Sequence, residues 1–250
     1  MGLDVVVQKL LGNLYNENEI ESRFSIKTIM AKSTLITNKS VKLFQIPNKI
    51  NRQEDILSCY RYYCDYLNKR GISEDTAIKY DIGYDKTNNQ ITFPLRNKDG
   101  NVLGIGRRSI QYKRYEYPKG MIKPVYGIYE LPERIRSLFI VEGPFNLWSL
   151  SEWNKNGIAL LGTGTENQYL ELIKIDTVNY VLALDPDEAG RRGIKKLINF
   201  LVKNHKYNIY VLMVPVGKDV NDLTFEEFKN TEVMYYKNWL SLFEEIQVDE

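Results

Sequence analysis

Cysteine and histidine are scarce in this chain of 250 residues. The sequence holds two cysteines, Cys59 and Cys64, and one histidine, His205. A zinc finger needs four Cys or His ligands, so these three residues cannot form one. Catalysis that pairs serine or cysteine with histidine would have to use His205, at the polar end of an expected helix, which argues against it. The cysteines fall in a helical pattern, and we expect both to be reduced residues of the core or its boundary.

Long apolar runs are also missing. No run approaches the ~18 residues of a membrane span, and no signal peptide with a basic start and a small-residue cleavage site is present. The net charge of +2 is too small to indicate nucleic-acid binding by itself, so any basic surface must be a local patch. We expect a cytoplasmic protein. Abundant lysine, asparagine, tyrosine and isoleucine are typical of an AT-rich genome and fit a bacteriophage origin, which would place the protein in the host cytoplasm.

The most informative stretch is NYVLALDPDEAG, residues 179–190. An apolar segment rich in strand formers ends at Leu184, and Asp185 and Asp187 follow before a long helical pattern begins. Both carboxylates therefore lie where a strand passes into a helix, and ligands of open parallel sheets bind beyond that end of the strands. A divalent cation between the like charges would keep both ionised. Alternatively, Asp187 caps the helix and Asp185 begins a turn; these two residues alone do not decide the question.

Two further stretches repeat this arrangement of an apolar strand followed by acidic residues. Glu142 ends the strand pattern in SLFIVEGPFN, and Asp219 and Asp222 follow the strand pattern in NIYVLMVPVGKDVND. Parallel strands end at the same edge of a sheet. We therefore expect acidic side chains from three strands to meet in one crevice.

Together, the motifs VEG, LDPDEAG and GKDVND resemble the TOPRIM domain, which is shared by DnaG-type primases of bacteria and phages, type IA and type II topoisomerases, and some nucleases. The resemblance spans residues 137–223. It implies an α/β fold with a mainly parallel, Rossmann-like sheet flanked by helices. It also implies Mg²⁺ or Mn²⁺, with two or more ions serving phosphoryl transfer. The implied ligands are Glu142, Asp185, Asp187 and Asp219, with Asp222 a weaker candidate. Glu142 either binds metal or acts as an acid or base.

The preceding stretch has helix and hairpin patterns. Residues 53–70 predict one helix, Ser73 caps a second short helix, and the NKDG turn joins two strand patterns into a hairpin. Residues 66–131 are similar to the small subdomain that precedes TOPRIM in the RNA-polymerase core of primases. Topoisomerases and stand-alone nucleases lack that subdomain, so the resemblance points to DnaG-type primases.

A basic cluster interleaved with tyrosines occupies this same portion of the chain. Such a mixture suits a phosphate backbone and stacked bases of single-stranded nucleic acid, although a solvated hairpin face would explain it as well. The primase resemblance favours the first reading and implies contacts with template or nucleotide. The predicted nucleic-acid or nucleotide contacts are Arg96, Arg107, Arg108, Lys113, Arg114, Lys119 and Lys123, joined by Arg191 and Lys218 beside the acidic motifs.

We expect three segments along the chain. Residues 1–50 hold a helix over 4–14 and a linker, and are similar to the helices that follow the zinc-binding ribbon of primases. Residues 51–135 form the smaller, basic α+β subdomain, and residues 136–250 form the TOPRIM domain with one or two C-terminal helices over 224–243. On this resemblance, the chain is a primase core without its zinc-binding domain.

The resemblance implies a DNA primase, a DNA-directed RNA polymerase that joins NTPs into a short RNA primer on single-stranded DNA. It also implies a partner, either a replicative helicase or a separate zinc-binding domain. Asn146 departs from the family pattern, which has an aspartate there, and so lowers the site's charge. Two alternatives remain open: a metal-dependent TOPRIM nuclease, and a primase-like module of the replisome that binds single strands with weak or no activity.

Overall fold

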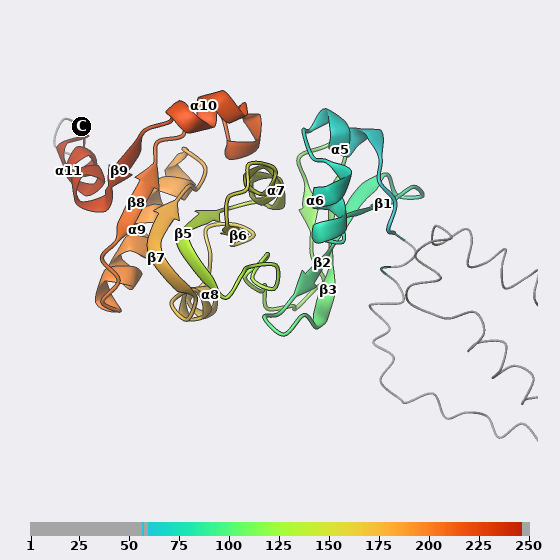
Figure 1. Ribbon diagram of the computed structural model, residues 1–250, viewed down its shortest axis with the longest axis horizontal. Coiled ribbons are helices and arrows are strands. Elements are labelled where there is room, and N and C mark those ends of the chain that lie inside the picture. The colour runs from blue at the N-terminus through green and yellow to red at the C-terminus, as the bar shows by residue number, and fades with distance from the viewer. Residues whose placement is uncertain (1–56, 58–59, 247–250) are drawn as a thin grey trace, which may run out of the picture. The chain divides into compact units, whose positions relative to one another are not determined.

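Two β-sheets organise the described part of the chain, which comprises Leu57 and residues 60–246 of this computed structural model (Figure 1). The small sheet has the strand order β1-β2-β3-β4, and the large sheet has the order β6-β5-β7-β8-β9. Both lie within one compact unit. The helix expected over residues 4–14 and the linker after it lie outside the described residues. The division at residue 135 between two domains stays a prediction.

The small sheet is antiparallel throughout. Its β2–β3 hairpin is closed by a turn in which the Asn97 side chain accepts hydrogen bonds from the backbone N–H groups of Asp99 and Asn101. Gly100 takes a positive φ of 83° there. The predicted Asp-Gly hairpin is therefore confirmed. The strands are β1 (Gly83–Asp85), β2 (Gln90–Arg96), β3 (Val102–Ser109) and β4 (Tyr115–Glu116).

The prediction of one continuous helix over residues 53–70 is wrong, because the helix is interrupted at residues 61–64. Residues 61–64 are not helical, and α5 (Asp65–Lys69) begins only after Cys64 in an extended conformation. The Tyr60 carbonyl instead accepts the N–H of Tyr84 at 2.8 Å. A Cβ at Gly83 would lie 1.7 Å from that carbonyl oxygen, so β1 packs directly on this backbone. Packing against β1 thus outweighs local helix propensity.

The other predictions for this portion hold. The Ser73 hydroxyl caps α6 (Glu74–Lys79) by accepting the N–H of Thr76 at 3.2 Å. Cys64 is a free, partly buried thiol. Cys59 lies outside the described residues.

The large sheet confirms the expected α/β architecture. Strands β5 (Arg134–Val141), β6 (Gly157–Ala159), β7 (Asp176–Leu182) and β8 (Ile209–Leu212) run parallel. Its helices are α7 (Pro144–Glu152), α8 (Glu166–Leu172), α9 (Glu188–Lys203), the 3₁₀ turn η1 (Val220–Asp222), α10 (Phe225–Asn230) and α11 (Tyr236–Ile246).

The C-terminal segment contains a strand that the sequence analysis missed. Between α10 and α11, β9 (Val233–Tyr235) pairs antiparallel with β8 and closes that edge of the sheet. The aromatic residues of this segment suggested helices alone. A three-residue strand carries too little alternation to be read from sequence, and pairing with β8 decides its conformation.

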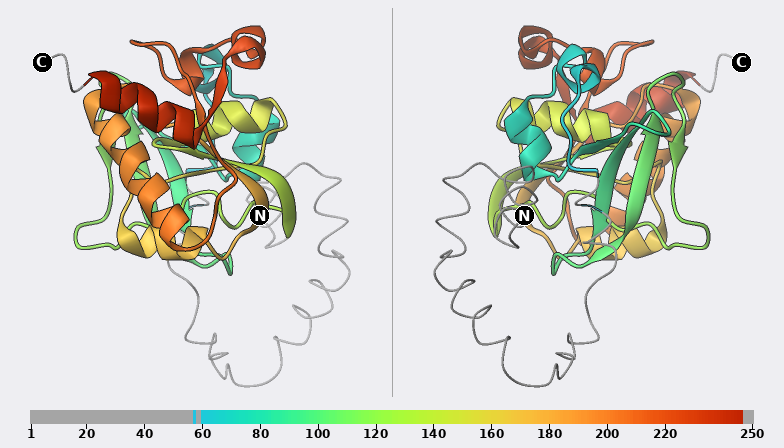
Figure 2. Two further views of the ribbon diagram at one scale, coloured as in Figure 1. Left: turned by 90° about the vertical axis from the view of Figure 1, so that its left-hand side faces the viewer. Right: turned by 90° about the vertical axis from the view of Figure 1, so that its right-hand side faces the viewer.

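Alternating strand residues divide the interior into two cores. Leu138 and Ile140 of β5 face a core shared with α8, α9 and α11, whereas Val141 faces a core shared with α7 and the small sheet. Figures 1 and 2 show α7 on the side of the large sheet that is turned toward the small sheet and α6. Trp148 of α7 is fully buried there and donates its indole N–H to the Tyr126 hydroxyl at 3.0 Å.

Among the described residues, no helix combines the length and the apolar character that crossing a bilayer requires.

Candidate active site

The predicted carboxylates converge at one end of the large sheet. Glu142 follows β5, Asp185 lies beyond β7, and Asp219 begins η1 after β8. All three line one cavity of about 200 Å³, which we call the inner cavity. Asp187 and Asp222 line an adjoining cavity of about 430 Å³, the lateral cavity, which shares Asp185 and Asp219 with it. Three strands separated in sequence thus deliver acidic groups to one place.

Gly190, at the start of α9, packs against the Asp185 backbone and the Glu142 carboxylate. A Cβ at Gly190 would lie 2.0 Å from the Asp185 carbonyl oxygen and 3.0 Å from Glu142 Oε1. Asp187 caps the helix, because its Oδ1 accepts the N–H of Gly190 at 2.7 Å. The capping reading of Asp187 is therefore confirmed, and its position in the lateral cavity leaves a second role open.

The electrostatics of the inner cavity penalise negative charge. Burial, followed by the charges of Asp185 and Asp187, raises the pKa of Glu142 to about 7. Burial and the Asp219 charge also raise the pKa of Asp185. Glu142 Oε1 is buried without any hydrogen-bond partner. Both carboxylates therefore resist ionisation at their positions in the inner cavity.

These properties fit a hard divalent cation, which would supply the charge and the partner that the carboxylates lack. Within residues 60–246, no three Asp, Glu, His or Cys side chains are close enough together to form a ready-made cation cage. Mg²⁺ is commonly bound by only one or two carboxylates, with water and substrate phosphates as the other ligands. The paired carboxylates of the cavity meet that requirement.

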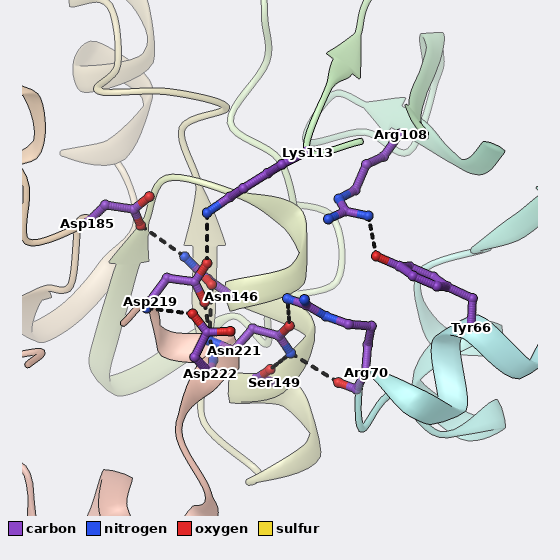
Figure 3. A network of polar contacts seen from close by, with 10 residues as sticks. All are labelled: Tyr66, Arg70, Arg108, Lys113, Asn146, Ser149, Asp185, Asp219, Asn221 and Asp222. Atoms are coloured by element: carbon purple, nitrogen blue, oxygen red, sulfur yellow. Dashed lines mark hydrogen bonds and ion pairs between the residues drawn. The ribbon is translucent and has the colours of Figure 1, made fainter. Parts of the chain in front are cut away.

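A chain of amides connects the acidic turns (Figure 3). Asn146, on α7, donates from Nδ2 to Asp185 Oδ1 at 3.3 Å and accepts the N–H of Asn221 at 3.1 Å. The Asn221 side chain donates to the Ser149 hydroxyl at 2.7 Å and accepts from the Arg70 guanidinium. The side-chain oxygen of Asn146 thus accepts a hydrogen bond from the η1 backbone, and its side-chain nitrogen donates to Asp185. Asn146 therefore fixes Asp185 relative to the turn that carries Asp219.

Arg108 forms part of the wall opposite the carboxylates. It is 6% exposed, lies over the Phe145 ring with 4.7 Å between guanidinium carbon and ring centroid, and donates to the Tyr66 hydroxyl. Its Nε is buried without a partner. A guanidinium held by aromatic rings, with one N–H unused, is well suited to bind phosphate.

The other predicted basic residues divide into two groups. Lys113 forms an ion pair with Asp219 at 3.3 Å, Lys123 donates to the Leu161 carbonyl at 2.7 Å, and Arg191 and Lys218 line the lateral cavity. Lys123 itself does not line either cavity, and nor do the remaining four: Arg96 pairs with Asp81, Arg107 lies over Tyr60, Arg114 pairs with Glu116, and Lys119 is exposed. For these four, the structure does not support a place beside the carboxylates.

Three residues of this site were missed by sequence reasoning. Tyr66, Arg70 and Asn221 contact Arg108, Phe145 or Asn146. Arg70 appeared as the basic end of a helix, and Tyr66 as one of several tyrosines on it. Neither carries a local signal, because both approach the cavity only when the small sheet packs on α7.

Comparison with known proteins supports the resemblance to the TOPRIM domain and to primases. Residues 139–224 match the Toprim-like family model. The chain is 26% identical over 197 residues to the uncharacterised protein MG010 of Mycoplasma genitalium, covering 75% of this chain and 90% of that protein. It is 23% identical over 241 residues to the DNA primase of Buchnera aphidicola subsp. Baizongia pistaciae, covering 89% of this chain and 40% of that primase.

The chain is thus similar in sequence to DNA primases. It also shares its fold with a solved DnaG primase catalytic domain bound to single-stranded DNA. The TM-score is 0.61 at 19% identity, over 72% of this chain and 79% of that one. The expected α/β TOPRIM fold is thereby confirmed. The chain spans two fifths of the length of the Buchnera primase.

Proposed function

We propose that this chain is the catalytic core of a DNA primase, which joins NTPs into short RNA primers on a single-stranded DNA template. One observation carries the proposal: Glu142, Asp185 and Asp219 share a cavity whose other wall includes the buried Arg108. The juxtaposition of acidic groups with a phosphate-binding guanidinium is what nucleotidyl transfer requires. The likeness to DNA primases supports this reading.

The cation ligands in this proposal are Asp185, Asp187 and Asp219, with Asp222 in support. Mg²⁺ or Mn²⁺ bound there would lower the pKa of the primer 3′ hydroxyl and neutralise the pyrophosphate that leaves. Glu142 lines the same cavity as these ligands and would either join them or accept the proton of the hydroxyl.

The chain's other residues would position the substrates. Arg108, which lines the inner cavity, would bind an NTP phosphate through its guanidinium, and its aromatic neighbours keep that group from turning away. Tyr115 and Tyr117 line the same cavity with stacked rings, 6.4 Å between centroids and 4° between planes. The Arg108 guanidinium lies over the Tyr115 ring and Lys123 Nζ over the Tyr117 ring, so the two tyrosines hold positive charge beside the cavity.

Partners and location belong to the same proposal. A single-stranded DNA template, NTPs and the RNA primer are the substrates and product. A replicative helicase, or a zinc-binding domain on a separate chain, would select the initiation site, since this sequence has too few Cys and His residues for such a domain. The cytoplasm, or the host cytoplasm for a phage protein, is where these substrates occur.

One assay separates this function from its alternatives. The chain is incubated with single-stranded DNA, labelled NTPs and Mg²⁺ or Mn²⁺, and the products are resolved by size. Labelled oligoribonucleotides support a primase, shortened DNA would show a nuclease, and DNA binding without either product would show a binding module.

The variant Asp185→Asn tests the site itself. It should abolish primer synthesis and leave the melting temperature close to that of the wild type. Asp176→Asn is the matched control, because that carboxylate is exposed at the opposite end of the same strand. Primer synthesis by Asp185→Asn at the control's rate would remove the metal-site hypothesis.

A further inference from the structure

The Lys113 ammonium points into the acidic site. Its Nζ lies 3.3 Å from Asp219 Oδ2, and Figure 3 shows the side chain extended from the β3–β4 loop toward that carboxylate. Lys113 therefore reaches from the small sheet to the carboxyl end of β8 in the large sheet. It lines both the inner and the lateral cavity.

The contact is positioned where a divalent cation would have to bind. Asp185 and Asp219 are the two carboxylates shared by both cavities, and Lys113 is the basic residue that lines the two cavities together with them. Asp219 is nearly buried, with 10% of its side chain exposed. A cation bound to the oxygen that Lys113 contacts would lie close to the ammonium and be repelled by it, so the two positive charges compete for the same carboxylate.

The contact is also easily broken. The Lys113 side chain is 69% exposed, and it approaches Asp219 through one oxygen only. Its loop is tied down at the other end, where the Ser109 hydroxyl accepts the N–H of Gln111 at 3.2 Å. Because the Lys113 end of the pair is open to solvent, we expect the contact to change an equilibrium constant by no more than about fivefold. The lysine stem is flexible, so the released ammonium can turn into the adjacent cavity without moving its loop.

We propose that Lys113 is a resident counter-cation of Asp219 which a divalent ion displaces, and that the released ammonium then binds a phosphate of the nucleic acid. This inference rests on the proposed function. It adds that cation loading and strand binding are coupled through one side chain. Coupling of this kind is reciprocal, so the cation strengthens strand binding and the strand strengthens cation binding by the same factor.

The first test measures Mn²⁺ affinity of the full chain by electron paramagnetic resonance, without nucleic acid or NTPs. Lys113→Gln removes the competing ammonium and should bind Mn²⁺ about three- to fivefold more tightly than the wild type. Arg114→Gln removes the same charge one residue away, where it pairs with Glu116 outside both cavities, and should leave the affinity unchanged. Lys113→Arg retains the charge and should resemble the wild type.

The second test measures strand binding by fluorescence anisotropy of a labelled single-stranded oligonucleotide, with EDTA and with Mn²⁺. Mn²⁺ should strengthen binding more in the wild type and in Arg114→Gln than in Lys113→Gln. Equal Mn²⁺ affinity in Lys113→Gln and the wild type would overturn this inference and leave the primase proposal intact. A wild-type chain that binds no Mn²⁺ would overturn both.

Discussion

Gly190 has no side chain, and this allows the start of α9 to pack closely against the acidic site. The first turn of α9 approaches so closely that a Cβ would lie 2.0 Å from the Asp185 carbonyl oxygen and 3.0 Å from Glu142 Oε1. Real Cβ atoms do not come this near to backbone oxygen. The glycine of the LDPDEAG motif is thus required by packing, and it lets the start of α9 lie against the Asp185 backbone and the Glu142 carboxylate.

We expect Gly190→Ala to destabilise the fold by about 2 to 3 kcal/mol, the range of overpacked cores, because the start of α9 must move away from β7. Urea denaturation followed by circular dichroism measures the change. Gly143→Ala is the control, since a Cβ there would meet its nearest neighbour at an ordinary 3.6 Å. An alanine at 190 that costs no more than the control would contradict the packing argument.

The raised pKa of Glu130 should make the stability of the fold depend on pH. Burial, the largest cause, raises its pKa from 4.5 to about 7 in the folded chain. The folded state then holds a proton that the unfolded state releases, so stability falls as pH rises from about 4.5 to about 7. Glu142 shifts in the same direction and adds to this slope.

Glu130→Gln should remove the Glu130 share of that slope and make the variant more stable than the wild type above pH 7, by about 2 kcal/mol. Urea unfolding at several pH values between 4 and 8 measures it. Glu133→Gln, an exposed neighbour, serves as control and should follow the wild type. Parallel curves for Glu130→Gln and the wild type would refute the assignment.

At the scale of the element, the N-terminus of α9 serves both the fold and the site. Asp187 caps the helix through Gly190 N–H and also lines the lateral cavity with Asp185 and Asp219. Asparagine caps a helix about as well as aspartate, whereas alanine does not. The two roles of Asp187 can therefore be separated by substitution.

Asp187→Asn should change the free energy of unfolding by less than about 0.5 kcal/mol and weaken Mn²⁺ binding, because the cap remains and the charge is lost. Asp187→Ala should lose both the helix cap and the charge, and the loss of the cap should cost about 1 kcal/mol in stability. Chemical denaturation and Mn²⁺ titration measure the two effects. Wild-type Mn²⁺ affinity in Asp187→Asn would restrict this residue to capping.

At the scale of the whole molecule, α7 packs against both sheets and joins them through one core. Its Trp148 contacts Phe93 of β2 in an edge-on arrangement, 5.6 Å between centroids, and donates to Tyr126. Phe93 and Trp148 are fully buried in the same core as Val141 of β5. The wall that carries Arg108 is therefore held against the carboxylates by this shared core.

Phe93→Ala should cost about 3 to 5 kcal/mol and increase amide hydrogen exchange in β5 as well as in β2, because one core supports both. Hydrogen exchange read by mass spectrometry resolves the two strands. Leu103→Ala on β3 is the control, since Leu103 is 42% exposed. Faster exchange confined to the small sheet would show that the sheets are independent.

Much of the fold was readable from local patterns, because each element of the TOPRIM portion carries its own signal. Strand formers end at Glu142 and near Asp185, helices start with caps, and the hairpin turn contains Asp-Gly. The failures occurred where a distant partner decides the conformation. Residues 61–64 are extended because β1 packs on the Tyr60 carbonyl, and β9 is a strand because it pairs with β8.

The candidate site divides in the same way. The sequence by itself determined which carboxylates follow which strands, because covalent order and strand patterning place them at the end where parallel strands meet. Only the tertiary structure decided that Arg108 and Lys113 face those carboxylates, that Arg96 and Arg107 do not, and that Asn146 bridges two acidic turns. Those facts depend on how the small sheet packs against α7, and such packing joins residues with no pattern in common along the chain.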